Sequence, residues 1–380
     1  MEKYYLATLK LVKGLGDRKI LRLLEIFQTA TRIWQLLPRE LEQTKLLTTV
    51  GLQHLQQLKK ENIPERLREI CVRQNIKIIT YRETEYPESL RQLCDCPILL
   101  YTKGQGNLTA TYNLAVVGPR EASLYGKQVV EYLLQALSKT TQQVQIISGG
   151  ARGIDTKAHL GALEYGLPTI AVFGCGLDQA YPPENSRLFE QIQTTGLIVS
   201  EYPPGSKASK FTFPARNRII CGLSRGVVLA EAPERSGALI TAELALENGR
   251  EVYCVPGSIF SKNTVGVHNL IKQGAKLITN IEDILIDFQD DFKVGNRPKN
   301  IFSGSDQYQQ ISLKEATNGL ELDEKQKNVY NSLDYQIELS AEDLLCKLQI
   351  ELSELNLVLL QLEMYGLAVR NEYNKKYLRK

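Results

Sequence analysis

Residues 144–155 read VQIISGGARGID and pass from an apolar run into a loop that holds three glycines. The run Val144–Ser148 is short, branched and apolar, as buried strands are. Glycines before a helix let a row of backbone N–H groups face one anion at the positive end of the helix dipole. We therefore interpret the segment as a strand, an anion-binding loop and the start of a helix.

Runs of the same kind recur on both sides of this segment, between residues 111 and 287. Each is followed by a loop and then by a helical segment. The alternation indicates βαβ crossovers, so the predicted fold class is α/β, with a doubly wound, mostly parallel Rossmann-like sheet. Ligands bind such sheets outside the carboxyl ends of the strands, so the loops there are expected to carry function. The flanking runs are Leu114–Val117, Thr169–Phe173, Leu197–Ser200, Val227–Leu229 and Val252–Val255.

The N-terminal part forms a separate expected domain, because 380 residues exceed what one ordinary core holds. Helical periodicity over residues 1–75 predicts a helical domain of the SAM or helix-hairpin-helix type. Its Gly-Leu-Gly turn at 14–16 is more simply a tight connection between core helices. Residues 76–287 are the predicted Rossmann-like domain, and strand-like runs at 76–81 and 98–101 extend its sheet.

The C-terminal part differs in composition from the sheet region. Residues 288–319 are polar and lack periodicity, which predicts a flexible linker. Residues 320–380 give three helical segments and a hairpin, the order of a winged-helix domain. The third helix, residues 349–365, holds three Glu but no Lys or Arg. Because carboxylates repel phosphates, we interpret this domain as a protein-contact or regulatory module that touches DNA at most weakly.

The net charge of the chain is only +3, so any argument for a polyanionic partner must be local. Residues 1–75 hold 14 Lys and Arg against 8 Asp and Glu, whereas residues 320–380 hold 8 against 11. The seven cysteines are scattered, which favours reduced thiols over disulfides or a zinc site. No uncharged run of about 18 residues occurs, so we expect a cytoplasmic protein with no membrane partner, metal or cofactor.

The loop after Leu114–Val117 begins Gly118-Pro119-Arg120-Glu121. A dinucleotide-binding turn needs Gly-x-Gly-x-x-Gly, and Arg120 stands where its second glycine would be, so the turn of an NAD enzyme is absent. An arginine here can offer a planar fork of donors to a phosphate. The alternative is a surface ion pair between Arg120 and Glu121.

Three side chains in and after the glycine-rich loop have separate expected roles. Arg152 adds a formal charge to the loop amides. Asp155 is interpreted as the cap of the following helix, because its side chain can accept from first-turn N–H groups. His159 falls four residues later on the same helix face. We interpret it as a histidine satisfied by the protein rather than a general base, since catalysis needs a positioned partner.

Residues 210–218 read KFTFPARNR and follow the run Leu197–Ser200. An aromatic ring among cations suits single-stranded nucleic acid, because bases stack on the ring while Lys and Arg hold the backbone. The alternative is that Phe211 and Phe213 anchor the next helix in the core. Alternate positions point opposite ways if the piece is extended.

A second small-residue turn, Ser236–Glu243, suits either a phosphate or close helix–sheet packing. No Ser–His–Asp order, Walker lysine motif or paired metal carboxylates occur, which favours a binding protein over an enzyme. The alternative is a Rossmann-like nucleoside-monophosphate hydrolase of the lysine-decarboxylase-like type. In it, Thr241 and Glu243 would position a ribosyl group and a water. The turn lacks the double glycine that would admit a nucleotide closely.

Five motifs, taken in order, resemble the successive signatures of the DprA/Smf family of DNA-processing proteins. The resemblance extends over nearly the whole chain, because residues 1–75 are similar to the family's helical N-terminal domain and residues 320–380 to its winged-helix tail. The motifs are Val116–Ser123, Ser148–Asp155 with His159, Phe213–Arg218, Ser236–Thr241 and Pro256-Gly257.

The resemblance implies a recombination mediator of natural transformation. Such proteins bind and protect incoming single-stranded DNA, load the RecA recombinase onto it and form homodimers through the Rossmann-like domain. Pro119 departs from the family, where Ser or Thr is common, and removes a possible hydroxyl donor. The expected DNA-binding residues are Gly118, Arg120, Ser148, Gly149, Gly150, Ala151, Arg152, Gly153, Lys210, Phe213, Arg216 and Arg218. The residues expected to be structural at the site are Asp155, His159, Asn217, Ser236 and Gly237.

Overall fold

The computed structural model describes residues 1–109, 112–140, 144–288, 322–333, 339–348, 350–365, 367–370 and 377–379. The chain divides into two compact units, residues 1–291 and 292–380. Apart from Phe288, the predicted linker lies outside the described residues. The domain boundaries at residues 75, 287 and 319 therefore stay predictions.

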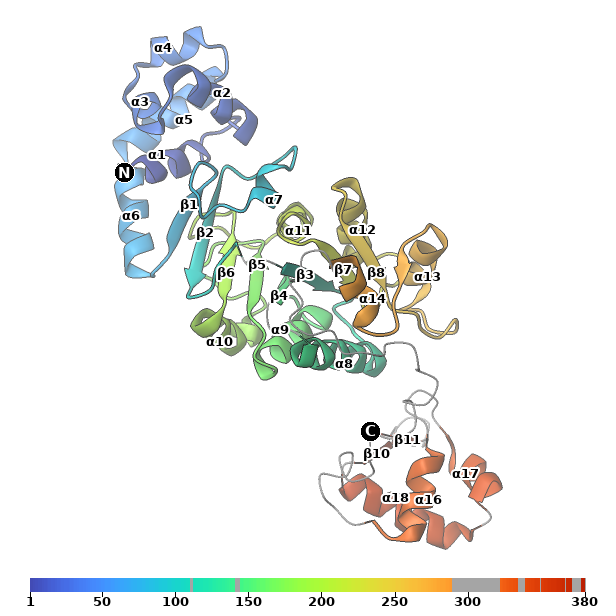
Figure 1. The fold of residues 1–380 in the computed structure, drawn as a ribbon. Helices are drawn as coiled ribbons and strands as arrows, with labels where there is room; N and C mark the ends of the chain where they lie inside the picture. The colour runs from blue at the N-terminus through green and yellow to red at the C-terminus, as the bar shows by residue number, and fades with distance from the viewer. Residues whose placement is uncertain are drawn as a thin grey trace. The chain divides into compact units, whose positions relative to one another are not determined.

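The first unit is built on a nine-stranded sheet in the order β1-β2-β6-β5-β4-β3-β7-β8-β9 (Figure 1). Strands β3 to β9 pair in parallel, and β1 and β2 add an antiparallel edge. The predicted doubly wound, mostly parallel sheet is confirmed, and the strand order reverses at β3. The strands are β1 (Lys77–Thr80), β2 (Leu99–Gly104), β3 (Tyr112–Val117), β4 (Val144–Ser148), β5 (Thr169–Phe173), β6 (Leu197–Ser200), β7 (Gly226–Leu229), β8 (Glu251–Cys254) and β9 (Lys276–Leu277).

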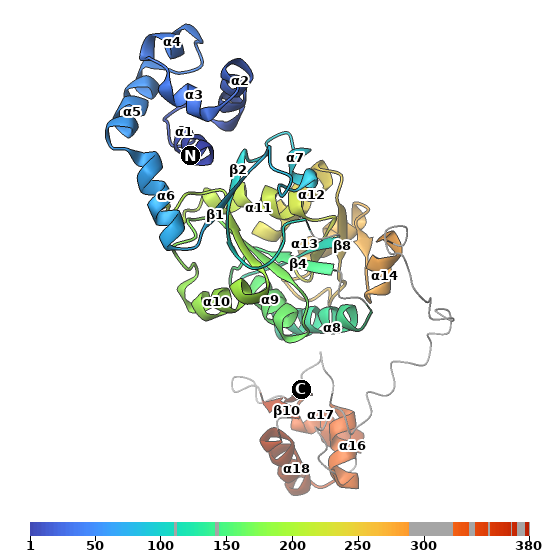
Figure 2. The same cartoon turned by 60° about the vertical axis from the view of Figure 1, so that its left-hand side comes forward.

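Helices cover both faces of this sheet, as buried parallel strands require. One face carries α8 (Leu124–Thr140), α9 (Ile154–Glu164) and α10 (Ser186–Thr195), and the other carries α11 (Thr212–Leu223) and α12 (Gly237–Glu247) (Figures 1 and 2). Every residue of β3, β4 and β5 is buried between these layers. Shorter elements are α7 (Glu88–Arg91), α13 (Val265–Lys272), α14 (Glu282–Leu285) and the 3-10 turns Pro183–Asn185 and Ile286–Phe288.

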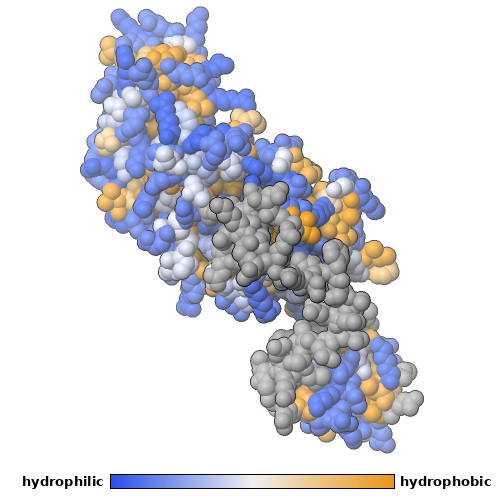
Figure 3. Space-filling model, viewed as in Figure 1, coloured by the Kyte–Doolittle hydropathy of each residue, from blue (hydrophilic) through white to orange (hydrophobic). Residues whose placement is uncertain are grey.

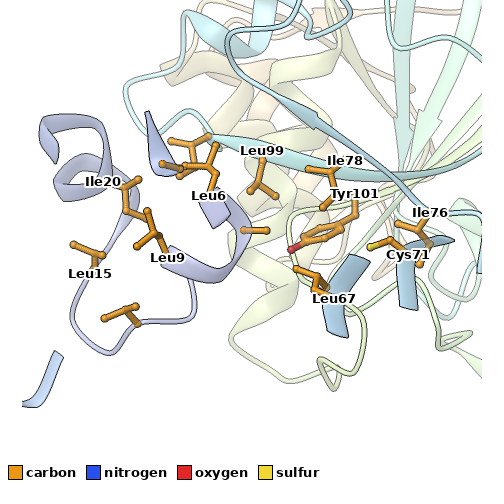
Figure 4. Close-up of a cluster of buried hydrophobic side chains, with 14 of the residues drawn as sticks. Leu6, Leu9, Leu15, Ile20, Leu67, Cys71, Ile76, Ile78, Leu99 and Tyr101 are labelled. Carbon is orange, nitrogen blue, oxygen red and sulfur yellow. The ribbon is translucent and has the colours of Figure 1, made fainter. Parts of the chain in front are cut away.

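The predicted helical N-terminus is also confirmed. Its helices are α1 (Glu2–Leu9), α2 (Asp17–Phe27), α3 (Ala30–Gln35), α4 (Pro38–Gln43), α5 (Thr49–Lys60) and α6 (Ile63–Arg73). They share one hydrophobic core with the antiparallel edge of the sheet, where Leu6, Leu67 and Cys71 cluster with Ile78 and Tyr101 (Figure 4). In the turn between α1 and α2 the leucine at position 15 is buried, as a tight connection between core helices requires.

The second unit has the predicted order of three helices and a hairpin. These are α16 (Glu324–Ser332), α17 (Ala341–Leu348), α18 (Leu352–Met364), β10 (Ala368–Arg370) and β11 (Tyr377–Arg379). Leu344, Leu355 and Leu359 belong to a hydrophobic core of its own. The role of this unit as a winged-helix, protein-contact module stays a prediction. No helix among the described residues of either unit is long and apolar enough to cross a membrane.

A chain of ion pairs joins the N-terminal helices to the sheet. Lys10 Nζ lies 2.8 Å from Asp17 and 2.9 Å from Glu201, and Arg218 lies 2.7 Å from Glu201 and 2.9 Å from Asp95. The Lys10, Glu201 and Arg218 side chains are only 14%, 12% and 14% exposed. Burial alone would raise the pKa of Glu201, but Lys10 and Arg218 outweigh burial and hold that pKa below its usual value.

Replacing Arg218 with Met should therefore destabilise the first unit by about 3 kcal/mol, because it removes a partner of a buried carboxylate while keeping the aliphatic stem. Urea unfolding followed by circular dichroism measures the loss. The matched control is Arg68→Met, since the pair of Arg68 with Glu65 is 51% and 35% exposed and should contribute less than about 1 kcal/mol. Equal, small losses in both variants would contradict a structural role for the ion pairs.

Candidate nucleic-acid interface

The loop between β4 and α9 is held from beneath by a carboxylate of the helix that follows it. Asp155 is buried, and its Oδ2 accepts hydrogen bonds of 3.2 Å from the amides of Gly149 and Ala151. Two of the amides expected to hold an external anion are therefore occupied by an internal one. The expected helix cap is wrong, because the α9 N-cap is Gly153 and Asp155 bonds the preceding loop instead.

Arg216 of α11 also forms hydrogen bonds with this loop. Its Nη1 donates to the carbonyl oxygen of Gly149 at 2.6 Å and also to that of Val172, while its Nε donates to Asn217 Oδ1 at 3.1 Å. A Cβ on Gly149 would lie 2.5 Å from that Nη1, so only glycine admits the guanidinium. Burial raises the pKa of Asp155, and the charge of Arg216 opposes this shift. Arg216 was expected to bind DNA, but it is only 5% exposed and is bonded to the protein.

Two more polar residues of this region are fully buried. Ser148 was expected at the DNA surface, but its hydroxyl donates to a backbone carbonyl of β3 at 2.7 Å. His159 Nδ1 lies 2.8 Å from Thr169 Oγ1, and that hydroxyl donates to the carbonyl of Ile146. Because the Thr169 hydroxyl uses its own proton on Ile146, the hydrogen bond between His159 and Thr169 is donated by the Nδ1–H of His159. Burial, with the charge of Arg216, lowers the pKa of His159 to about 3, so the ring is neutral.

The glycines at the carboxyl ends of β3 and β4 provide close packing. Gly118 lies against Ile154, and a Cβ there would come within 2.4 Å of it. Gly150 and Gly153 have φ angles of 68° and 74°, which favour glycine. A Cβ on Gly153 would also lie 2.2 Å from the carbonyl oxygen of Pro119. These contacts lock the loop after β3 to the loop after β4.

Five exposed or half-buried side chains stand in the loops after β3 and β5 and in the segment that leads from β6 into α11, and we call them the rim cluster. The ring of Phe213 lies 5.3 Å from that of Tyr181, and the guanidinium of Arg120 lies 5.3 Å from the same Phe213 ring. Lys210 lies 5.2 Å from the ring of Phe211, which is 75% exposed. Arg120 and Lys210 are both exposed.

Arg152 borders the rim cluster from the loop after β4. Its side chain is exposed and pairs with Glu184 of the loop after β5. A pair at this exposure contributes little to stability, so the guanidinium can exchange its partner for a phosphate at small cost. Within the described residues, the amides of Arg152 and Gly153 have no hydrogen-bond partner, and they stand at the start of α9.

The remaining predicted residues have structural partners. Arg218 was expected to bind DNA, but its side chain belongs to the buried ion pairs with Glu201 and Asp95. Asn217 donates to the carbonyl of Gly237 at 3.5 Å, and Ser236 caps α12 by accepting from the amide of Leu239. The structure therefore places Arg120, Arg152 and Lys210 at the surface, with Arg120 over the Phe213 ring, and leaves Arg216, Arg218 and Ser148 within the protein.

Two functional candidates escaped the sequence argument. Tyr181 stands in a loop without periodicity, where no pattern predicts its contact with Phe213. Glu231 is buried at the end of β7 and accepts hydrogen bonds from the amide and hydroxyl of Ser123. The sequence signal for Glu231 was an acidic residue two positions after the apolar run Val227–Leu229, where the carboxyl end of a strand was expected.

The rim cluster offers donors and ring faces rather than reacting groups. Among the described residues, no cluster of His, Cys, Asp and Glu could hold a metal ion. A cavity of about 890 Å³ is lined by Tyr81, Tyr112 and Arg225 among others, and it includes none of the predicted site residues. What the rim cluster can do is bind a flexible chain that carries both flat rings and phosphates.

Comparison with known proteins identifies relatives of this chain. A family model described as DNA recombination-mediator protein A matches residues 77–289. The DNA processing protein DprA of Streptococcus pneumoniae is 49% identical over 204 residues, which cover 54% of this chain and 71% of that protein. Protein Smf of Synechocystis sp. is 37% identical over 291 residues, which cover 75% of this chain and 72% of that protein.

Two solved structures share the fold. The X-ray structure of DNA processing protein A from Streptococcus pneumoniae has a TM-score of 0.67 at 39% identity and covers 76% of this chain and 98% of its own. DNA processing protein A from Helicobacter pylori, whose structure concerns its single-stranded DNA binding mode, has a TM-score of 0.51 at 31% identity and covers 57% and 97%. The chain therefore belongs to the DNA recombination-mediator protein A family, the DprA/Smf family that its motifs resemble.

Proposed function

We propose that this protein binds single-stranded DNA at the rim cluster and hands the strand to a recombinase without catalysing a reaction itself. The observation that carries the proposal is the contact series Arg120–Phe213–Tyr181, with 5.3 Å between each neighbouring pair. An exposed ring next to a cation, such as Phe211 beside Lys210, suits unpaired bases, whose phosphates follow the same path.

A duplex would not fit this chemistry as well. Its bases are already stacked on one another, so exposed rings gain a partner only from a strand whose bases are unpaired. Arg120, Arg152 and Lys210 would hold phosphates, while Phe211, Phe213 and Tyr181 would receive bases. The single-stranded DNA binding mode described for the Helicobacter pylori protein supports the same ligand class here.

The family resemblance supports the rest of the proposal. We infer that the protein protects incoming DNA, loads RecA onto it, and acts in the cytoplasm as a homodimer through the Rossmann-like unit. The second unit would contact a protein partner, because α18 carries Glu354 and Glu363 and no Lys or Arg. No cofactor or metal takes part in this scheme.

Binding should weaken with salt in proportion to the phosphates held. Three contacts predict a log–log slope of roughly −2 for an oligo-dT strand, and Arg120→Ala should reduce its magnitude by about 0.7. Fluorescence anisotropy across a salt titration gives both slopes. Arg68→Ala, on the exposed surface of α6, is the control and should leave the slope unchanged. A slope that does not depend on Arg120 would count against the proposal.

Stacking can be separated from packing at Phe213. Phe213→Leu keeps an apolar side chain beside Gly174 but removes the ring face, and should weaken oligo-dT binding by about 1–3 kcal/mol. A thermal melt shows whether the fold is intact. If this variant binds oligo-dT with the affinity of the wild type, Phe213 serves packing and does not stack on a base.

The hydrolase alternative can be tested directly. Thr241, which would have to position a ribosyl group, is buried and donates to the carbonyl of Gly237 at 3.1 Å, which supports a packing role. We expect no base release from nucleoside monophosphates in a chromatographic assay. Stoichiometric release that is lost in Glu243→Gln would favour the enzyme instead.

A further inference from the structure

We propose that the loop after β8 carries a second stacking point for the same DNA strand, centred on Phe260. This inference rests on the function proposed above and extends its site. Ile259 and Phe260 are 77% and 92% exposed. The space-filling view shows hydrophobic surface on the side of the first unit where α12 and α13 lie (Figure 3). Neither residue belongs to the rim cluster.

The loop that presents this pair is closely bonded. The Thr264 hydroxyl donates to the carbonyls of Ser258 and Ser261 at 2.6 and 3.0 Å, and the amide of Ser261 donates to Ser258 at 3.1 Å. Outside the loop, Tyr125 donates to the carbonyl of Pro256 at 2.5 Å. The backbone that presents Phe260 is therefore ordered before a ligand binds, so little backbone entropy remains to be lost on binding.

The same loop is tied to the loop of Arg120. Glu231 accepts from the amide of Ser123 at 3.0 Å and lies 3.5 Å from the side-chain nitrogen of Asn263. The same nitrogen donates to the carbonyl of Glu121 at 3.3 Å. Strands β3, β7 and β8 are successive neighbours in the sheet, so the carboxyl ends of β3 and β8 are about 10 Å apart. One strand that leaves Arg120 can reach this loop.

The loop carries the same residue types as the rim cluster, an exposed ring and an exposed lysine close to it in sequence. Exposed Lys262 follows Phe260 by two residues, as exposed Lys210 precedes Phe211 by one. A ring with an open face beside a cation is the pairing that receives a base and its phosphate. The exposed Lys262 adds a positive charge that can pair with a phosphate, so we favour a polyanion with flat rings over an apolar protein surface as the ligand of this loop.

Fluorescence of a single introduced tryptophan tests this inference. The chain has one tryptophan, Trp34, in the N-terminal helices, so F260W is made in a Trp34→Phe background. An oligo-dT of about 20 nucleotides should quench its emission, because stacked bases quench an indole. F211W reports on the rim cluster in the same way. V72W, at a 72% exposed position of α6, is the matched control and should not respond.

Quenching of both F211W and F260W at the same DNA concentration supports the inference. Quenching of F211W alone overturns it while the proposed function stands, and failure of both probes removes the proposed function as well. Phe260→Ala should raise the Kd for the same oligomer by about 5- to 100-fold. If Phe260→Ala instead lowers the mass measured by light scattering and leaves the Kd unchanged, Phe260 contacts a second copy and the inference is wrong.

Discussion

Two buried charged side chains, Asp155 and Arg216, hold the loop between β4 and α9, and the site depends on this constraint. The carboxylate holds the amides of Gly149 and Ala151, and the guanidinium holds the carbonyls of Gly149 and Val172. Four elements, β4, β5, α9 and α11, are thereby fixed around one loop. Losing either side chain would leave backbone amides or carbonyls of this loop buried without their hydrogen-bond partners, which costs about 1–3 kcal/mol for each group. The geometry of the exposed surface above this loop therefore depends on Asp155 and Arg216.

The cations at the carboxyl end of the sheet therefore fall into a buried group and an exposed group. The buried cations Arg216 and Arg218 bind carboxylates and carbonyls of the protein, whereas Arg120 and Lys210 stand over aromatic rings at the surface. The exposed cations are the ones that can pair with a phosphate without first breaking the fold. Ring faces beside them extend the surface for bases. This division favours a binding protein whose surface is formed before its ligand arrives.

Periodicity predicted the sheet, because strands that are buried on both faces carry continuous branched, apolar runs. It missed β9, whose two residues are too few to form a pattern. The candidate site was predicted at the level of loops but not of individual cations. Arg216 and Arg218 lie in one cation-rich motif with Lys210, and only tertiary packing decides which of them is buried. Tyr181 joined the site through a contact across loops that no local signal encodes.

The decisive experiment for the binding site is a crystal structure of the full chain with a short deoxythymidine oligomer. We expect one base against Phe213, phosphates within hydrogen-bonding distance of Arg120 and Lys210, and Asp155 and Arg216 still bonded to Gly149 beneath them. An oligomer seated on the second unit, or at the amino end of the strands, with the rings of Phe211 and Phe213 uncovered, would contradict it.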